Sequence, residues 1–212
     1  MNKLNLFFIL IAVSLVTFNS CDYKQKQKEE ERKKKEEQEY AIRLKEFARV
    51  KKDLNNLLKQ AVNITAYRVR ETHALIATDY IKFQIINNTT KDLRYIEWET
   101  TFYNDFGDYI GENRFSYEAN NKADVLKSGY QVELTWALSI FAENLLYDIY
   151  KHSDTYTTKI DKIRIRLADN NKYIEYIDYE AGISRQLDVL YASESAINDI
   201  KKEISLLKSI LK

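Results

Sequence analysis

Proline is missing from this 212-residue chain, and glycine occurs only four times. These two residues end helices and strands most readily, proline because it lacks a backbone donor and glycine because its backbone rotates freely. The four glycines, Gly107, Gly111, Gly129 and Gly182, all lie in the second half of the sequence. The first half therefore holds no strong breaker, and a long uninterrupted helix can form there.

The residue types that carry most enzyme chemistry are also scarce. The chain has one cysteine and two histidines, His73 and His152. One cysteine excludes an internal disulfide, and two distant histidines do not match the ligand spacing of a zinc site. His152, Ser153 and Asp154 are consecutive, whereas a catalytic triad is assembled in space. We therefore expect no catalytic residue, no metal and no cofactor, and we interpret the protein as a non-enzyme.

The two signs of charge are balanced. The chain carries 33 Lys and Arg against 32 Asp and Glu, a formal net charge of +1. Without residues 1–20, whose only charged side chain is Lys3, the two counts are equal. Domains that bind nucleic acid need a clustered basic excess, so this composition gives no case for a nucleic-acid partner.

The first 20 residues have the layout of a secretion signal. Lys3 and the amino terminus are positive, and residues 6–16 (LFFILIAVSLV) form an apolar run. The run is shorter than the about 20 residues that a membrane-spanning helix needs. A basic start, a short apolar run and small residues before a cleavage site are typical of a signal peptide. There are two alternatives to a lipoprotein signal. One is an ordinary signal peptide that a cysteine follows by chance, and the other is an anchor that is not cleaved.

The tetrapeptide Phe18-Asn19-Ser20-Cys21 resembles the lipobox of bacterial lipoproteins. The resemblance implies that residues 1–20 are removed, that the Cys21 sulfur carries a lipid and that the new amino terminus is acylated. Several acyl chains on one residue suffice for stable anchoring, since each buried methylene contributes about 0.8 kcal/mol. The expected location is the bacterial cell envelope, with the protein lipid-anchored to a membrane and either periplasmic or surface-exposed.

Residues 21–62 are predicted to form a charged helical stalk. Residues 22–39 have almost no apolar side chain, and pairs such as Glu29 and Lys33 have the four-residue spacing that stabilises helices. A plain charged linker is the alternative for this part. An apolar stripe then joins the same helical register. Its members are Tyr40, Leu44, Phe47, Leu54 and Leu58.

Residues 190–212 are predicted to form a second amphipathic helix, which Ser193 or Ser195 can cap. Its apolar stripe must be covered by the first stripe, by the central domain or by a second copy of the chain. Packing within one chain is the favoured interpretation, and a homo-oligomer through this stripe is the alternative. The stripe consists of Ile197, Ile200, Ile204, Leu207 and Leu211.

Between the helices, residues 63–180 follow a period of two, which is typical of half-buried strands. Ile96, Trp98 and Phe102, for example, alternate with polar residues on one predicted strand. Polar clusters such as residues 87–90 separate the runs. Regularly spaced short strands of this kind predict an antiparallel sandwich. One segment, residues 140–151, is instead predicted to be a short helix.

Two of these runs resemble the FxLYD group of immunoglobulin-like domains in bacterial extracytoplasmic proteins. They are residues 83–93 (FQIINNTTKDL) and 98–108 (WETTFYNDFGD), and the resemblance covers about residues 80–176. It implies an adhesive or structural module without catalytic residues. The expected fold class is therefore α+β: an antiparallel immunoglobulin-like β-sandwich, flanked by a long N-terminal helix and a C-terminal amphipathic helix.

Aromatic side chains concentrate at Tyr173, Tyr176 and Tyr179. Tyrosine is enriched at binding surfaces, so these three form a candidate binding surface, and half-buried strand positions are the alternative. We expect a membrane-anchored lipoprotein that serves as a non-enzymatic binding or structural module and contacts a protein or another envelope component. A coiled-coil oligomeric envelope scaffold is the second hypothesis, and an enzyme with an unrecognised site is disfavoured.

Replacing Cys21 tests the lipid anchor. In a Cys21→Ala variant we expect the protein to leave the membrane fraction, or to remain as an unprocessed precursor, because the acylated sulfur is lost. Cell fractionation followed by mass spectrometry of the intact chain measures both outcomes. A variant that stays membrane-bound at the mature mass would contradict lipidation at this residue.

Overall fold

The computed structural model describes residues 3–73, 76–121, 124–138, 156–170 and 172–211. Within these ranges, the side chains before residue 25, those of residues 70–79 and those of residues 137–138 are not described. The predicted helix at 140–151 and the His152-Ser153-Asp154 run therefore lie outside the described residues, as does the Cys21 side chain. The chain divides into two compact units, residues 1–46 and 47–212.

The first element is the long helix α1, Lys3–Ala61, which runs without a break as the absence of glycine and proline predicts. In its charged part the Lys33 Nζ lies 3.3 Å from the Glu29 Oε1, and the Arg32 Nε lies 3.4 Å from the Glu36 Oε1. Exposed pairs of this kind contribute only tenths of a kcal/mol each, about 0.3–0.5 kcal/mol. Among the described residues, no helix combines the length and apolar character needed to cross a membrane.

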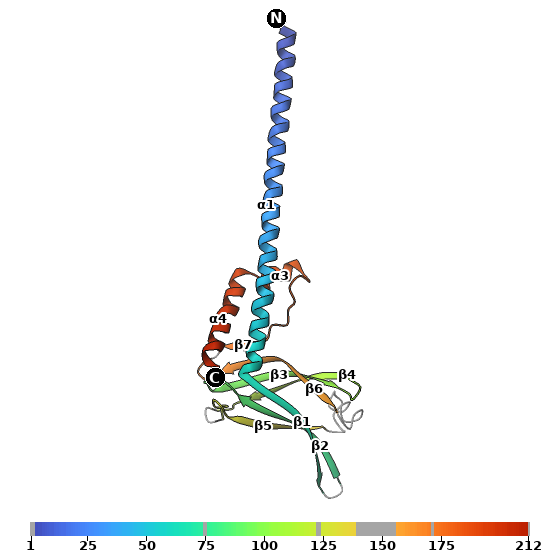
Figure 1. Cartoon of the computed structure of the whole chain (residues 1–212), viewed down its shortest axis with the longest axis vertical. Coiled ribbons are helices and arrows are strands. Elements are labelled where there is room, and N and C mark those ends of the chain that lie inside the picture. Colours follow the sequence, from blue (N-terminus) through green and yellow to red (C-terminus); the bar gives the residue numbers. More distant parts are fainter. Residues whose placement is uncertain (1–2, 74–75, 122–123, 139–155, 171, 212) are drawn as a thin grey trace. The chain divides into compact units, whose positions relative to one another are not determined.

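After α1 come seven described strands, which form a two-layer antiparallel sandwich (Figure 1). One sheet has the order β1-β2-β5 and the other the order β4-β3-β6-β7. The first, second and fifth strands lie opposite the third, sixth and seventh, as in an immunoglobulin-like domain. The fourth strand pairs with the third, whereas in the constant-type immunoglobulin arrangement it belongs to the other sheet. The predicted fold class is confirmed. The strands are β1 (Val62–His73), β2 (Ile76–Asn87), β3 (Leu93–Tyr103), β4 (Tyr109–Glu118), β5 (Gln131–Leu138), β6 (Thr157–Leu167) and β7 (Tyr173–Glu175).

An aromatic cluster fills the space between the sheets. Trp98 on β3 is fully buried, and its ring lies 6.2 Å from that of Trp136 on β5 and 5.1 Å from that of Phe83 on β2. The ring centroid of Phe115 on β4 lies 4.6 Å from that of Phe83. The period-two pattern placed Trp98 on an inward face, and the structure confirms this. Trp136 also reaches the cluster but is only partly buried.

The turn after β2 is organised by the fully buried side chain of Asn87. Its Nδ2 donates to the carbonyl oxygens of Lys91 (2.8 Å) and Leu126 (3.0 Å). Its Oδ1 accepts from the backbone nitrogen of Thr89 (2.9 Å) and from the Thr89 hydroxyl (2.8 Å). Two donors and one acceptor are thus satisfied inside the protein, where leaving them unpaired would be costly.

The same turn binds the ends of two helices. The Asn88 backbone nitrogen donates to the Ala61 carbonyl at the end of α1 (2.9 Å), and its side chain donates to Gln60 (3.1 Å). The Thr90 nitrogen donates to the Ile210 carbonyl at the end of α4 (Glu194–Ile210), at 2.6 Å. Carbonyls that a helix end leaves without an intrahelical partner are satisfied in this way.

Helix α4 agrees with the predicted C-terminal helix, with one correction. Ser193 caps it, its side chain accepting from the Ala196 nitrogen at 3.2 Å. Four residues of the predicted stripe are buried within the chain, but the fifth buried position is Ile210 and not Leu211. The helix ends at Ile210, and Leu211 adopts an extended conformation and bridges to Thr89. The buried members of the predicted stripe are Ile197, Ile200, Ile204 and Leu207.

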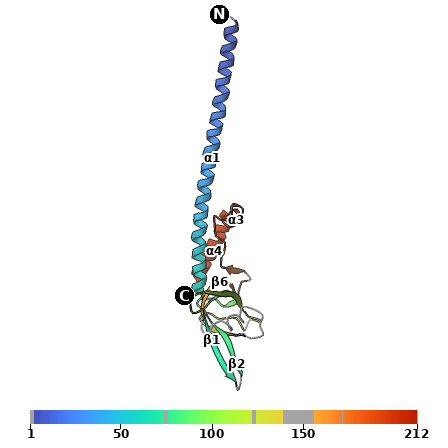
Figure 2. The same ribbon diagram turned by 90° about the vertical axis from the view of Figure 1, so that its right-hand side faces the viewer.

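From Phe47 onward, α1 lies with α4 on the side of the sandwich formed by β6 and β7 (Figures 1 and 2). Phe47, Leu54 and Leu58 of its stripe are buried, as is Val50. The half-buried Lys51 also faces the protein. Its Nζ donates to the Tyr179 carbonyl at 2.9 Å, so the helix contacts the segment after β7 with a polar side chain as well.

Replacing Asn87 tests the role of this turn. Asn87→Ala leaves buried donors and acceptors without partners, and we expect it to lower the free energy of unfolding by about 3 kcal/mol. Asn120→Ala, at an exposed turn, serves as the control, with an expected change below about 0.5 kcal/mol. Chemical denaturation followed by tryptophan fluorescence measures both. Equal midpoints in the two variants would contradict this role of Asn87.

Candidate functional site

The segment that follows β7 is held by side chains of α1. Asn55, only 7% exposed, donates from Nδ2 to the Ile177 carbonyl and accepts at Oδ1 from the Ile177 nitrogen, both at 3.0 Å. The side-chain amide thus pairs with the backbone of Ile177 as a neighbouring strand would. Together with the bond from Lys51 to the Tyr179 carbonyl, this fixes the path of the chain beyond the sheet.

Tyr179 connects this segment to a helix that the sequence did not reveal, α3 (Arg185–Tyr191). Its ring is stacked on Tyr191, with centroids 4.5 Å apart and planes at 20°, and lies 6.1 Å from Phe47. Its hydroxyl donates to the Asp188 carboxylate at 2.6 Å. One tyrosine therefore combines an apolar body, packed between elements, with a polar end that has a partner.

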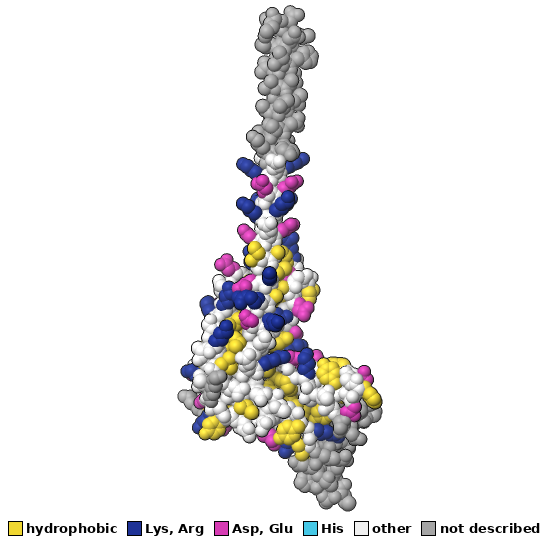
Figure 3. Space-filling model, viewed as in Figure 1, with side chains coloured by type: hydrophobic (Ala, Val, Ile, Leu, Met, Phe, Trp, Pro, Cys, Tyr) yellow, Lys and Arg dark blue, Asp and Glu magenta, His cyan; other side chains and the backbone are white. Residues whose placement is uncertain are grey.

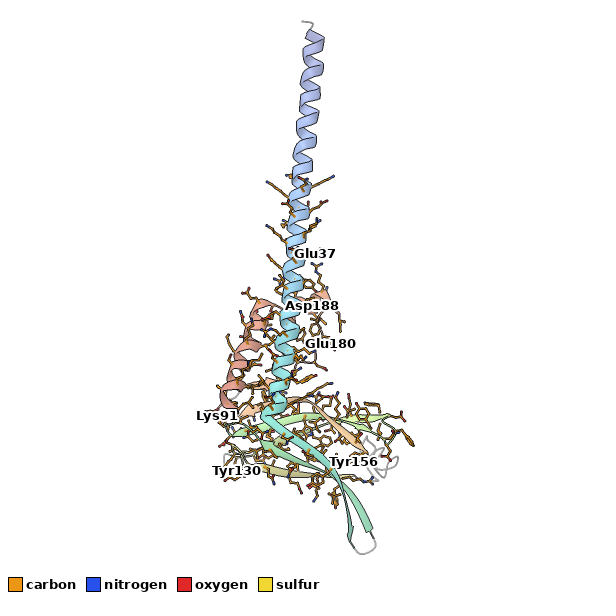
Figure 4. The ribbon with its side chains drawn as sticks, viewed as in Figure 1. Glu37, Lys91, Tyr130, Tyr156, Glu180 and Asp188 are labelled. Atoms are coloured by element: carbon orange, nitrogen blue, oxygen red, sulfur yellow. The ribbon has the colours of Figure 1, made fainter. Side chains whose placement is uncertain are left out.

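Asp188 is the buried residue of α3, at 1% exposure (Figure 4). Besides the Tyr179 hydroxyl, its Oδ1 accepts from the Gly182 nitrogen at 2.9 Å. Gly182 has φ +95°, a conformation that side-chain-bearing residues rarely adopt. A carboxylate is rarely buried without partners. These contacts therefore determine which side of α3 faces the protein.

Because α3 turns its aspartate inward, it turns its apolar side chains outward. Each of these is between 41% and 73% exposed, and hydrophobic side chains are visible at the surface in this region (Figure 3). A short helix usually shows the opposite pattern, with apolar residues inside. The exposed residues, together called the α3 patch, are Leu187, Val189, Leu190 and Tyr191 of the helix and Ile183 just before it.

An open groove with a volume of about 580 Å³ adjoins the α3 patch. Tyr176 and Tyr179 of the predicted surface line it, together with Tyr191 and Leu190 of the patch and Ile200 of α4. The groove therefore joins residues that are far apart in the sequence into one aromatic and aliphatic surface.

Tyr173, the third predicted tyrosine, does not line this groove. It lies on the solvent-facing side of the four-stranded sheet, under the Arg164 guanidinium (4.0 Å) and at 90° to Tyr95 (ring centroids 5.3 Å apart). Burial, and then a hydrogen bond to Glu97, raise the pKa of Tyr95 to about 12. This arrangement of tyrosines and arginines stabilises the sheet surface through cation–π contacts.

The described residues contain no cluster of three or more metal-ligating side chains. The acidic hairpin between β3 and β4 is closed by Asn104, whose Oδ1 accepts from the nitrogens of Phe106 (2.9 Å) and Asp108 (2.8 Å). Gly107 has the positive φ (+82°) that this tight turn requires. The carboxylates of this hairpin therefore belong to a tight turn. The groove beside the α3 patch, in contrast, is lined by tyrosines, aliphatic side chains and carboxylates.

Sequence reasoning found two of the tyrosines in the groove and missed the rest of the site. It gave Asn55 no role, and it assigned no element to residues 181–189. Ser184 followed by RQLDVLY was the available signal, since serine commonly precedes a helix. That Asp188 faces inward could not be inferred, because its partners lie outside the helix.

No family model and no curated protein matches the chain. Among solved structures, a DUF1425 family member from a Shewanella species is 15% identical, with 48% of this chain and 77% of that chain covered and a TM-score of 0.28. An X-ray structure of a Northeast Structural Genomics Consortium target is 6% identical over 60% of this chain and 93% of that chain, with a TM-score of 0.29. Similarity at this level carries no argument about function, and the resemblance to the FxLYD group stays a prediction.

Proposed function

We propose that this protein is a lipid-anchored bacterial lipoprotein whose folded unit binds another protein of the cell envelope without catalysing a reaction. The observation that carries the proposal is the α3 patch beside a tyrosine-lined groove. Apolar side chains scattered singly on a surface need no explanation, but five exposed ones within residues 183–191, next to a groove, are typical of an interaction site. The groove is lined by Tyr176, Tyr179 and Tyr191, and tyrosine is a residue favoured in protein interfaces.

The way in which the α3 patch is maintained supports a binding role. A sequence that only needed stability could bury Leu187 or Leu190 and leave Asp188 in water. Here the carboxylate is buried and satisfied by Tyr179 and Gly182, and the apolar side chains stay outside. Keeping apolar side chains exposed lowers solubility, so a partner that covers them is the simplest physical reason for the arrangement.

The anchoring part of the proposal rests on the amino-terminal sequence. The apolar run of residues 6–16 and the lipobox-like residues 18–21 support export and attachment through Cys21. The immunoglobulin-like sandwich is consistent with the FxLYD-like reading of residues 80–176 as an extracytoplasmic module. We place the protein in the bacterial envelope on these grounds.

The oligomeric scaffold receives less support. Its proposed contact surface, the stripe on α4 that begins at Ile197, is buried within a single chain. Using it between chains would require α4 to leave its own sandwich, which Thr90 holds at Ile210. A homo-oligomer through this stripe stays a prediction, and the binding module is the function that the geometry supports better.

Photocrosslinking in living cells tests the proposal. The full-length chain, carrying p-benzoylphenylalanine at Leu190, should give a discrete product with one protein, because the α3 patch is covered by its partner. The same residue at Tyr130, which is also exposed but lies on the sandwich away from α3 (Figure 4), should not give this product. Absence of any product at position 190, or identical products at both positions, would contradict binding through the patch.

A further inference from the structure

We infer that the partner surface of this groove is a cationic amphipathic segment of another protein, with lysine or arginine beside aliphatic or aromatic side chains. The inference rests on the proposed binding function and specifies the chemistry of the partner. It follows from three features of the described groove: the sign of the charges in its lining, the freedom of those charges to accept further bonds, and the apolar character of the adjoining patch.

The charges in the groove lining are of one sign. Four carboxylates line it, and no lysine or arginine is among the lining residues that the structure describes. The stretch that forms most of the groove, residues 173–203, holds seven acidic and three basic residues, and the three cations outside it that pair with the lining, Lys162, Arg164 and Lys172, bring its formal charge from −4 to −1. The carboxylates in the lining belong to Glu175, Asp178, Asp199 and Glu203.

Each of these carboxylates already has one cation near it, contributed by a residue outside the lining. The N–O distances lie between 2.9 and 3.4 Å, and three of the four carboxylate side chains are 57–69% exposed. Such exposed ion pairs contribute little to stability, and a carboxylate has lone pairs for further donors. The groove can therefore accept cations of a partner without unfolding. The pairs are Arg164–Glu175, Lys162–Asp178, Lys202–Asp199 and Lys172–Glu203.

The apolar neighbours exclude other classes of ligand that would also bind carboxylates. The exposed patch side chains Ile183, Val189 and Leu190 are aliphatic and offer no hydrogen bonds to a carbohydrate. The lining itself supplies no cation to bind an anionic phospholipid headgroup or a nucleic acid. A polypeptide with apolar side chains spaced along one helical face and cations beside them satisfies both the patch and the lining.

Two labelled peptides test the inference directly. A 14-residue peptide of leucine and lysine, patterned as an amphipathic helix, is compared with one in which every lysine is glutamate. Fluorescence anisotropy with the full-length protein in neutral maltoside micelles, and protein-free micelles as blank, gives the affinities. We expect the lysine peptide to bind at least about tenfold more tightly, and its binding to weaken with added salt.

Variants assign the binding to this groove. The double change Glu175→Gln and Asp178→Asn should weaken binding of the lysine peptide about fivefold, because two charged acceptors become neutral. Val189→Asp should weaken it as well, because it places a charge in the apolar patch. Phe106→Ser, at the exposed β3–β4 hairpin, is the matched control and should leave the affinity unchanged. Thermal unfolding of each variant verifies that the fold is intact.

The outcomes separate this inference from the proposed function. Equal affinity for the two peptides, or a double variant indistinguishable from Phe106→Ser, overturns the cationic partner even if crosslinking at Leu190 yields a protein. Labelling of lipid from position 190, in proteoliposomes of phosphatidylethanolamine and phosphatidylglycerol, would assign the patch to the membrane and also overturn it. If neither peptide binds and Leu190 gives no protein product, the binding function itself fails.

Discussion

The pairing of Asn55 with the backbone of Ile177 is the contact on which the candidate site depends. Just beyond β7 one last backbone bond, from the Tyr176 nitrogen to the Ile163 carbonyl of β6 (3.0 Å), ties the chain to the sheet. After it, the side chains of Asn55 and Lys51 hold the segment by its backbone. Asn55 supplies both a donor and an acceptor from the last two turns of α1, inside a helix, where asparagine otherwise lowers helix stability. A residue that is unfavourable locally is thus explained by a contact with a distant part of the chain.

From that contact the arrangement follows in steps. The fixed segment places Tyr179 against Phe47 and Tyr191, and the Tyr179 hydroxyl reaches Asp188. Because Asp188 must face these donors, the aliphatic side chains of α3 face solvent. The sandwich provides a rigid support for this segment, and the segment provides the chemistry that a partner can recognise. Immunoglobulin-like sandwiches support many unrelated functions, so the site, and not the fold, carries the functional proposal.

The sandwich could be predicted from local patterns because each strand shows its buried face in alternate residues, as Ile96, Trp98 and Phe102 do. The helix stripes could be predicted for the same reason, except that the last buried position shifted to Ile210 where the helix ends. The site could be predicted only in part. Tyr176 and Tyr179 were visible as an aromatic concentration, but the inward orientation of Asp188 depends on partners that no local pattern reveals.

Hydrogen exchange across residues 176–192 tests the central claim most directly. In an Asn55→Ala variant we predict at least about tenfold faster exchange in this region, since two part-buried hydrogen bonds to Ile177 are lost, while the protected amides of β2 and β3 exchange at unchanged rates. Asn56→Ala, at the exposed neighbouring position of the same helix, should leave both regions unchanged. Unchanged exchange at 176–192 in the Asn55→Ala variant would show that the site does not depend on this contact.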